Sequence, residues 1–208
     1  MARRTPEEAA KTRRALLQAA LDVFSERGAA NGTLKEVAAR ADVTHGALYW
    51  HFKDREVLLR ELFIDSELPF ERHYLEQLQA ARQDALMALE SYVLAVLQEI
   101  TGNEQSRKVF RLFYTGSDTC KELAALAPLR CEALEQPLEH IRQFLKLARK
   151  QGQTGLKKRQ IEPMSRALFS LLFGLLQSSQ LAPDLFSYAQ QGPLLVRNCL
   201  DGLRAAAK

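Results

Sequence analysis

Hydrophobic residues recur at the three- to four-residue spacing of α-helices along almost the whole chain. The first stripe predicts a helix that begins near Pro6 and ends at Gly28, because proline suits the first helical turn and glycine the position after the last. Its buried side is expected to hold Leu16, Leu17, Ala20, Leu21 and Phe24. The alternation that indicates strands is absent over four or more residues, and β-branched residues are sparse. The pattern therefore predicts an all-α protein.

Two short helices with capping signals are expected to follow. Thr33 with Glu36 three positions later is the sequence pattern of a capping box, and it predicts a helix of about two turns from Leu34. Asp42 is expected to end this helix, because aspartate tolerates the left-handed conformation of a tight turn. Thr44 then provides a side-chain cap for the next helix.

The helix after Thr44 has an unusual outward face. Exposed helix faces normally carry Glu, Lys, Gln or Arg, which are well solvated and lose little side-chain freedom. This helix offers glycine, histidine and aromatic residues instead, so we expect the face to contact a partner. Inward positions are expected at Val43, Ala47, Leu48 and Phe52, and outward positions at His45, Gly46, Tyr49, Trp50 and His51.

The chemistry of the outward face suits duplex DNA. Tyr49, Trp50 and His51 can donate hydrogen bonds, and the cations Lys53 and Arg55 follow them at positions suited to phosphate contacts. A second helix of this kind reads base edges in the major groove with few side chains. The predicted DNA contacts are Thr33, Lys35, Thr44, His45, Gly46, Ala47, Tyr49, Trp50, His51, Lys53 and Arg55.

A specific resemblance rests on the same residues. The matching positions are Gly28, Thr33, Val37, Ala38, the run GALYWHF at residues 46–52, and Arg55. Over residues 12–62 the spacing resembles the N-terminal domain of TetR-family transcriptional regulators, and it looks most like the AcrR/TtgR group, which represses multidrug efflux genes. Three positions depart from the pattern: Asp42 replaces a turn glycine, His45 an arginine common in that group, and Arg55 a lysine.

The resemblance implies a function as well as a fold. It implies a cytoplasmic, ligand-responsive repressor of multidrug efflux genes that binds double-stranded operator DNA as a homodimer. A small hydrophobic or amphipathic effector would release it. Two alternatives stay open: a TetR-like regulator of another pathway with a different effector, and a helical protein-interaction module that binds no DNA. A salt-dependent affinity for duplex DNA would distinguish the module from the regulators.

The resemblance also divides the chain into two domains. Residues 1–55 are expected to form a three-helix helix-turn-helix domain, and residues 56–208 a larger helical ligand-binding and dimerisation domain. A linking helix is expected over about 54–69, where Pro69 should kink or end it. Further helices are predicted at residues 82–101, 105–115, 121–151 with irregularities near Pro128 and Pro137, 163–181 and 193–206.

The last two predicted helices are candidates for a dimer interface. The helix from Pro163 is apolar nearly all round and must be covered on every side. In the resembling family the two C-terminal helices form a four-helix interface with their symmetry mates, whereas the alternative is the core of a monomer. The predicted interface residues are Leu168, Leu172, Leu175, Leu176, Leu195, Val196, Leu200 and Leu203.

The middle helices are rich in aromatic residues and contain a methionine. In the resembling family this region encloses a ligand cavity, and such side chains with a few polar groups suit varied drug-like molecules. The alternative is ordinary core, and His140 is more simply read as a satisfied histidine. The predicted ligand contacts are Met87, Tyr92, Phe110, Phe113, Tyr114, His140, Phe144, Phe169 and Phe173.

Composition narrows the function classes further. The 208 residues are 47% hydrophobic with a net charge of +4, which suits a small domain plus a larger one. The longest apolar stretch, residues 167–176, is too short for a bilayer, so no membrane contact is expected. Cys120, Cys131 and Cys199 are predicted to be reduced thiols. No nucleophile and base pairing, glycine-rich phosphate loop or metal-ligand spacing appears, so enzymatic activity, a cofactor and a metal site are not expected.

Overall fold

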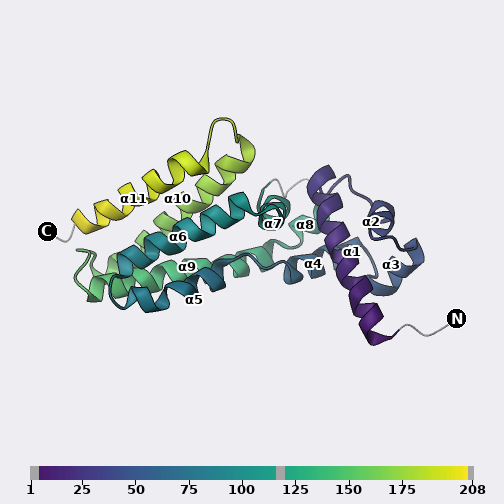
Figure 1. Ribbon diagram of the computed structural model, residues 1–208, viewed down its shortest axis with the longest axis horizontal. Coiled ribbons are helices and arrows are strands. Elements are labelled where there is room, and N and C mark those ends of the chain that lie inside the picture. The colour runs from purple at the N-terminus through teal and green to yellow at the C-terminus, as the bar shows by residue number, and fades with distance from the viewer. Residues whose placement is uncertain (1–4, 116–119, 206–208) are drawn as a thin grey trace. The chain divides into compact units, whose positions relative to one another are not determined.

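The computed structural model describes residues 5–115 and 120–205, and these contain helices and no strand. This confirms the predicted all-α class (Figure 1). The helices are α1 (Pro6–Arg27), α2 (Leu34–Arg40), α3 (His45–His51), α4 (Arg55–Asp65), α5 (Phe70–Ala81), α6 (Ala85–Gly102), α7 (Glu104–Tyr114), α8 (Lys121–Ala124), α9 (Ala127–Lys150), a 3-10 turn (Lys158–Gln160), α10 (Ile161–Leu181) and α11 (Tyr188–Ala205).

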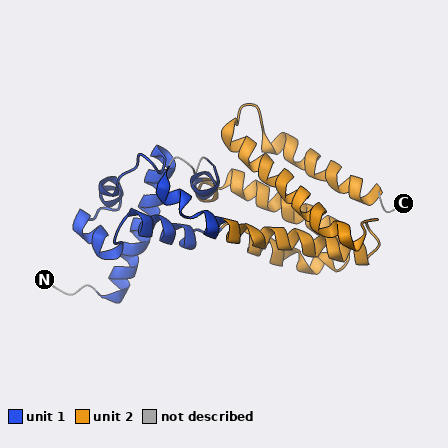
Figure 2. Ribbon diagram, turned by 180° about the vertical axis from the view of Figure 1, so that it is seen from behind, with its two compact units in different colours: residues 1–67, 108–130 blue, residues 68–107, 131–208 orange. Residues whose placement is uncertain are grey.

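The chain forms two compact units, coloured separately in Figure 2. The first comprises residues 1–67 and 108–130, and the second residues 68–107 and 131–208. This division differs from the boundary expected after Arg55. The reason is packing: α4 lies against α1 and α8 and therefore belongs to the first unit. Helices α7 and α9 each pass from one unit into the other.

The capping signals in the first unit act as predicted. The Thr33 hydroxyl accepts a hydrogen bond from the Glu36 amide at 3.2 Å, and the Glu36 carboxylate accepts one from the Thr33 amide at 2.9 Å. Asp42 adopts the left-handed conformation with φ 53° and so ends α2 in a tight turn. Thr44 caps α3 by accepting from the Ala47 amide at 3.2 Å. These caps set the entry points of α2 and α3.

The second unit is built around α6, which packs against α5, α10 and α11. Nine of its residues, from Ala85 to Ile100, are buried. By length and composition alone, α6 could cross a membrane, with a mean hydropathy of 1.2 over 18 residues. The sequence prediction of no membrane contact considered only the apolar stretch at residues 167–176. Half of the α6 segment is buried inside the protein, which is also typical of the core helix of a soluble protein.

Several helix boundaries differ from the sequence prediction. The linking helix ends at Asp65, and the chain resumes as α5 at Phe70, a helix that the pattern did not predict because it buries only Phe70 and Ala81. The predicted helix over 121–151 is interrupted after Ala124. The last helix begins earlier than expected, at residue 188 rather than 193.

Candidate DNA-binding surface and effector region

Helix α3 is held in place by two fully buried side chains. Leu48 lies at the centre of the helix and Phe52 directly after its end, and neither is accessible to solvent. The Arg13 guanidinium of α1 lies over the Phe52 ring, 5.6 Å from its centroid. The first unit therefore fixes the orientation of α3 through its inner face, and its outer side chains are directed away from the core.

The outer face of α3 is exposed and aromatic, as the sequence predicted. Trp50 is 73% exposed and Tyr49 is 47% exposed. Tyr49 packs edge-on against His45, with ring centroids 4.9 Å apart, and Trp50 packs edge-on against His51 at 4.6 Å. His51 is half-buried rather than fully outward. The aromatic contacts hold the hydrogen-bonding groups of Tyr49 and His45 close together at the surface.

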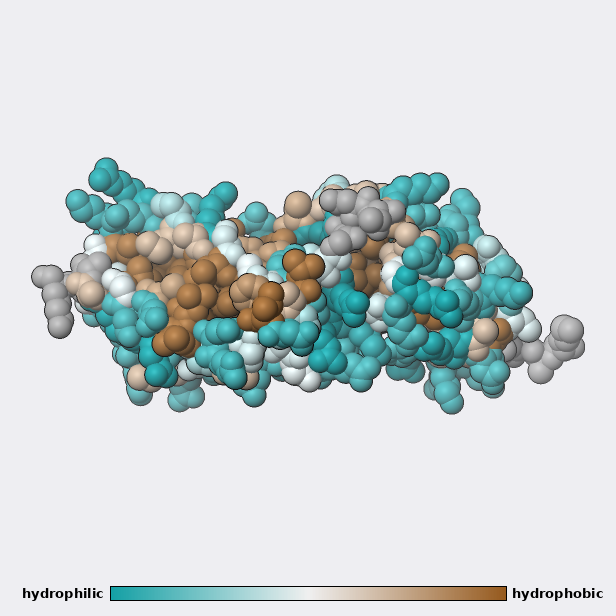
Figure 3. All heavy atoms as spheres, turned by 90° about the horizontal axis from the view of Figure 1, so that it is seen from above, coloured by the Kyte–Doolittle hydropathy of each residue, from teal (hydrophilic) through white to brown (hydrophobic). Residues whose placement is uncertain are grey.

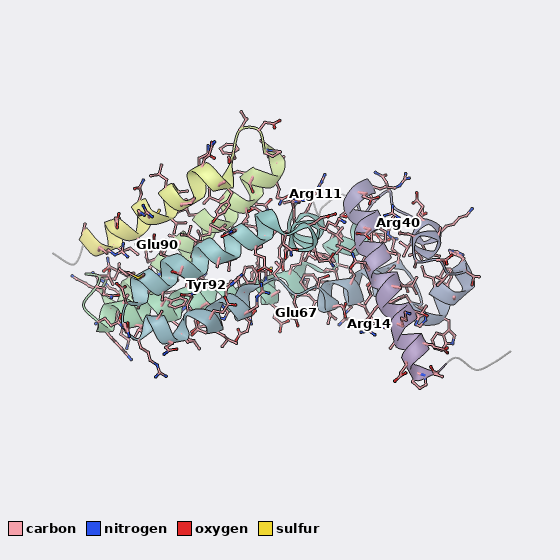
Figure 4. All side chains as sticks on the ribbon, viewed as in Figure 1. Arg14, Arg40, Glu67, Glu90, Tyr92 and Arg111 are labelled. Atoms are coloured by element: carbon pink, nitrogen blue, oxygen red, sulfur yellow. The ribbon has the colours of Figure 1, made fainter. Side chains whose placement is uncertain are left out.

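Some cations of the first unit form ion pairs within the protein, and others are available to contact a partner. The Arg40 guanidinium of α2, labelled in Figure 4, pairs with Glu26 of α1 at 2.9 and 3.1 Å, and this hydrogen bonding lowers the pKa of Glu26. Arg27 pairs with Glu36 in the same way at 3.1 Å. Lys35 and Lys53 are exposed and form no ion pair within the described part of the chain. The available lysines are therefore free to contact phosphates.

Arg55 is placed differently from the exposed phosphate contact that its sequence position suggested. Its Nη1 donates a hydrogen bond to the Gly32 carbonyl at 2.8 Å, and its guanidinium lies 5.1 Å from the centroid of the Phe24 ring. The residue is half-buried, and its Nε and Nη2 are buried without a hydrogen bond among the described residues. Arg55 therefore ties the start of α4 to α1 and to the turn before α2.

We expect Arg55→Ala to lower the free energy of unfolding by about 1–3 kcal/mol, because it removes a charged hydrogen bond and a cation–π contact. Urea denaturation measures this loss. We expect the salt dependence of DNA binding to stay the same in the variant, because the Arg55 guanidinium contacts the Gly32 carbonyl and the Phe24 ring. A direct phosphate contact would instead reduce the slope of log affinity against log salt by about one for each bound copy.

A polar cluster lies inside the second unit, around Tyr92 of α6 (Figure 4). Its hydroxyl lies 3.1 Å from His140 Nδ1, and His140 Nε2 lies 3.1 Å from the Glu71 carboxylate. Burial lowers the pKa of His140 and raises that of Tyr92. A neutral imidazole therefore accepts from the Tyr92 hydroxyl and donates to Glu71. Tyr74 stacks on the His140 ring with centroids 4.0 Å apart, which completes the cluster.

Three of the predicted ligand contacts meet at a small internal cavity. Tyr92, Phe169 and Phe173 line a space of about 30 Å³ between α6, α9 and α10, together with Phe70 and Pro137. Drug-sized pockets measure about 300–1,000 Å³. A ligand at this place would have to displace side chains, and Phe169 and Phe173 are only half-buried. The sequence did not predict Phe70 and Pro137 as ligand contacts, because neither belongs to a distinctive motif.

Other predicted ligand residues lie elsewhere. Met87 is 59% exposed, because the helical repeat of α6 turns it away from the buried stripe. Phe110, Phe113 and Tyr114 belong to the first unit, where Phe113 packs edge-on against Phe63 with centroids 5.1 Å apart. Burial raises the pKa of Tyr114 to about 12, so this phenol stays protonated. These four residues do not line the internal cavity of the second unit.

The predicted dimer residues divide into core and partly exposed positions. Buried within the unit are Leu168, Leu176, Val196, Leu200 and Leu203, and half-buried are Leu172, Leu175 and Leu195. The buried stripe of α11 is explained by its packing against α6 and α10. Arg197 and Arg204 of α11 also approach Glu90 of α6, labelled in Figure 4, at 3.6 and 3.7 Å. These five residues therefore contribute to the core of the unit itself.

The outward sides of α10 and α11 carry several exposed apolar and small residues among polar ones. Leu181 and Leu194 are 88% and 62% exposed, and Leu171 is half-buried. Gly174 and Gly202 are exposed, and a Cβ placed on either would meet no atom within 4 Å. Figure 3 shows apolar side chains gathered over the unit that contains these helices. The α10–α11 outer face, defined by these five residues, is suited to close helix packing against another surface.

The three cysteines are free, but they are not alike. Cys120 is buried, and its Sγ lies 2.9 Å from a Glu122 carboxylate oxygen, a hydrogen bond that lowers the pKa of Glu122. Cys131 is exposed, and Cys199 is intermediate. Among the described residues, no three His, Cys, Asp or Glu side chains are grouped to hold a metal ion.

Comparisons with known proteins identify relatives along the whole chain. Residues 16–62 match the family described as bacterial regulatory proteins, tetR family. The transcriptional repressor BepR of Brucella suis biovar 1 (strain 1330) is 29% identical, over 99% of this chain and 98% of BepR. The transcriptional regulator AcrR of Shigella flexneri is 30% identical, over 92% of this chain and 88% of AcrR.

A solved structure extends the similarity to the fold. It is the crystal structure of NalD, the secondary repressor of the MexAB-OprM multidrug efflux pump in Pseudomonas aeruginosa. NalD is 27% identical to this chain, with a TM-score of 0.77, and the match covers 95% of this chain and 98% of NalD. The similarity therefore includes the helical region that follows the helix-turn-helix.

Proposed function

The chain belongs to the TetR family of bacterial regulatory proteins, and we propose that it is a cytoplasmic repressor of multidrug efflux genes released from its operator by small hydrophobic molecules. The relatives support repression and efflux, since BepR is named a repressor and NalD represses an efflux pump. The relatives named above are regulators, which gives no reason to propose a catalytic activity.

The observation that carries the proposal is the exposed face of α3. Tyr49 and Trp50 lie at the surface of a helix whose inner side is fixed by buried Leu48 and Phe52. Neighbouring exposed tyrosine and tryptophan side chains are typical of interaction surfaces. With Lys35 and Lys53 available as exposed cations in the same unit, the partner that fits is a major groove with its phosphates.

The proposed assembly is a homodimer formed through the α10–α11 outer face. A second copy would cover Leu171, Leu181 and Leu194, and Gly174 and Gly202 would let the helices approach closely. A dimer places two α3 helices on a palindromic operator, where they read half-sites about 34–36 Å apart. Because such a contact is isologous, the same face on each copy covers the face of the other.

The effector is proposed to enter the second unit at the internal cavity beside Tyr92. Phe169 and Phe173 would move to enlarge it, and the Tyr92–His140 pair would supply polar contacts to an otherwise apolar molecule. Binding would release DNA only to the extent that the effector prefers the non-binding arrangement of the dimer. A coupling of about 1–3 kcal/mol corresponds to roughly 5- to 150-fold weaker operator binding.

Thermodynamic reciprocity provides the test of this function. We expect an effector, selected from hydrophobic compounds by its stabilisation of the protein against heat, to bind about 5- to 150-fold more weakly when the protein is saturated with operator duplex. Calorimetric titration with and without duplex measures the ratio. The duplex should carry the palindrome found upstream of the protein's own gene or of a neighbouring efflux operon.

Other outcomes would point to the alternatives. Equal effector affinity with and without duplex would contradict ligand release. Specific binding to a palindrome beside genes unrelated to efflux would indicate a TetR-like regulator of another pathway. Absence of salt-dependent affinity for any duplex would contradict DNA binding and favour a protein-interaction module.

A further inference from the structure

The second unit carries a groove between α5, the C-terminal half of α9 and the start of α10, and Phe144, one of the predicted ligand contacts, lines it. Its volume is about 660 Å³, which falls within the range of pockets that hold drug-sized ligands. Tyr74, Leu78 and Ile161 give it apolar walls, and it is lined by none of the residues at the small cavity beside Tyr92. The groove is therefore a separate space with enough room for a ligand.

The rim of the groove is strongly basic. Four exposed cations line it: Arg82, Arg149, Lys150 and Lys158. None of the four forms an ion pair within the described part of the chain. Glu162 is the one acidic residue in the lining, and its carboxylate is already paired. Its two partners are Arg142, at 2.5 Å, and Arg166, at 2.7 Å. The groove therefore presents several uncompensated positive charges beside apolar walls.

We propose that this groove binds an amphipathic organic anion: a drug-sized molecule with an apolar body and a carboxylate, sulfonate or sulfate group. The apolar body would lie against Tyr74, Leu78 and Ile161, and the anionic group would reach the cations of the rim. Arginine and lysine attract such groups through charge-assisted hydrogen bonds. Apolar walls give no advantage to a nucleic-acid backbone, which would use the charges alone.

This site is distinct from the proposed operator-binding surface and from the internal effector cavity, although Tyr74 both lines the groove and stacks on His140 of the Tyr92 cluster. Its position does bear on regulation, because α5 forms one wall and only residues 66–69 separate α5 from α4. Glu71 of α5 also contacts Gln136 and His140 of α9, at 2.9 and 3.1 Å. An anion in the groove would add a further link between the same two helices.

Two fluorescent probes that differ by one group test the proposal with the full chain. They are 1-anilinonaphthalene-8-sulfonate and its uncharged relative N-phenyl-1-naphthylamine, which lacks the sulfonate. We expect Lys150→Glu with Lys158→Glu to weaken binding of the sulfonate about tenfold or more, and to change binding of the uncharged probe less than about twofold. Fluorescence titration at fixed salt measures both.

The matched control is Lys157→Glu with Arg159→Glu. These exposed cations neighbour Lys158 but do not line the groove, and the double reversal changes the net charge equally. We expect less than about a twofold effect on the sulfonate probe. An equal loss in both double variants would overturn the proposal, since it would reflect net charge alone. Displacement of the sulfonate by random duplex DNA would also overturn it, in favour of a polyanion surface.

A filling variant covers the case in which charge reversal disturbs folding. Gln143 is exposed and lines the groove, so Gln143→Trp should occupy the space without changing charge. We expect it to weaken binding of the sulfonate probe about tenfold, with circular dichroism unchanged. Unaltered affinity in this folded variant would mean that the probe binds elsewhere, and the groove would not be its site.

Discussion

Replacing Tyr49 and Lys53 together by alanine is expected to weaken operator binding about 100- to 1,000-fold. Tyr49 supplies an exposed hydrogen-bonding ring on α3, and Lys53 an available cation directly after it. Both changes are present twice in a dimer, so a loss of about 1.4–2 kcal/mol of binding free energy in each half-site gives this factor. Loss of Lys53 from both copies should also reduce the slope of log affinity against log salt by about two. Gel shift or fluorescence anisotropy across a salt series measures both quantities.

Arg40→Ala is the matched control for this result. It also removes one cation from the DNA-reading unit, but the guanidinium is engaged by Glu26 at 2.9 and 3.1 Å. We expect operator affinity and salt slope to change little. If Arg40→Ala and the double variant had the same effect, the outer face of α3 would not be the contact surface.

Gly174→Arg is expected to convert the dimer to a monomer and to lower operator affinity at least 100-fold. Gly174 lies on the outer face of α10, where a Cβ would meet no atom within 4 Å, so the chain itself can accommodate the larger side chain. Two opposed copies would each have to bury an arginine in an apolar contact. Loss of the second reading head removes an avidity of about 10²- to 10⁴-fold. Light scattering after size-exclusion chromatography gives the oligomeric state.

Gly102→Arg provides the control for a new cation in an open helical position. Gly102 ends α6, is equally free of neighbours for an added Cβ, and lies outside the α10–α11 outer face. This variant should remain dimeric and bind the operator normally. A dimeric Gly174→Arg protein with normal affinity would show that the interface lies elsewhere.

The two short helices α2 and α3 could be predicted from the sequence because their signals are local. The Thr33–Glu36 capping box, the left-handed turn at Asp42 and the cap at Thr44 act over a few residues, so the pattern places α2 and α3 correctly. The aromatic exposure of Tyr49 follows from the same helical repeat. Such features depend little on what the rest of the chain does.

The role of Arg55 could not be read in this way. Its contacts, the Gly32 carbonyl and the Phe24 ring, lie 23 and 31 positions away in the sequence. The sequence indicates a cation after α3, but only the folded unit determines whether that cation faces solvent or α1. The same reason explains His140, whose state depends on Glu71 and Tyr92 from other helices.

The sequence by itself determined the all-helical class, the helix-turn-helix and its exposed aromatic face, because helical periodicity and capping act over distances shorter than a few turns. Only the tertiary structure decided which apolar residues are core and which form an outer face. The reason is that every side of an apolar helix such as α10 looks alike until α6 and α11 cover part of it, leaving Gly174 and Leu181 outside and Leu168 and Leu176 inside. The basic groove likewise exists only where α5, α9 and α10 meet, so its charges, separate in the sequence, become one site through packing.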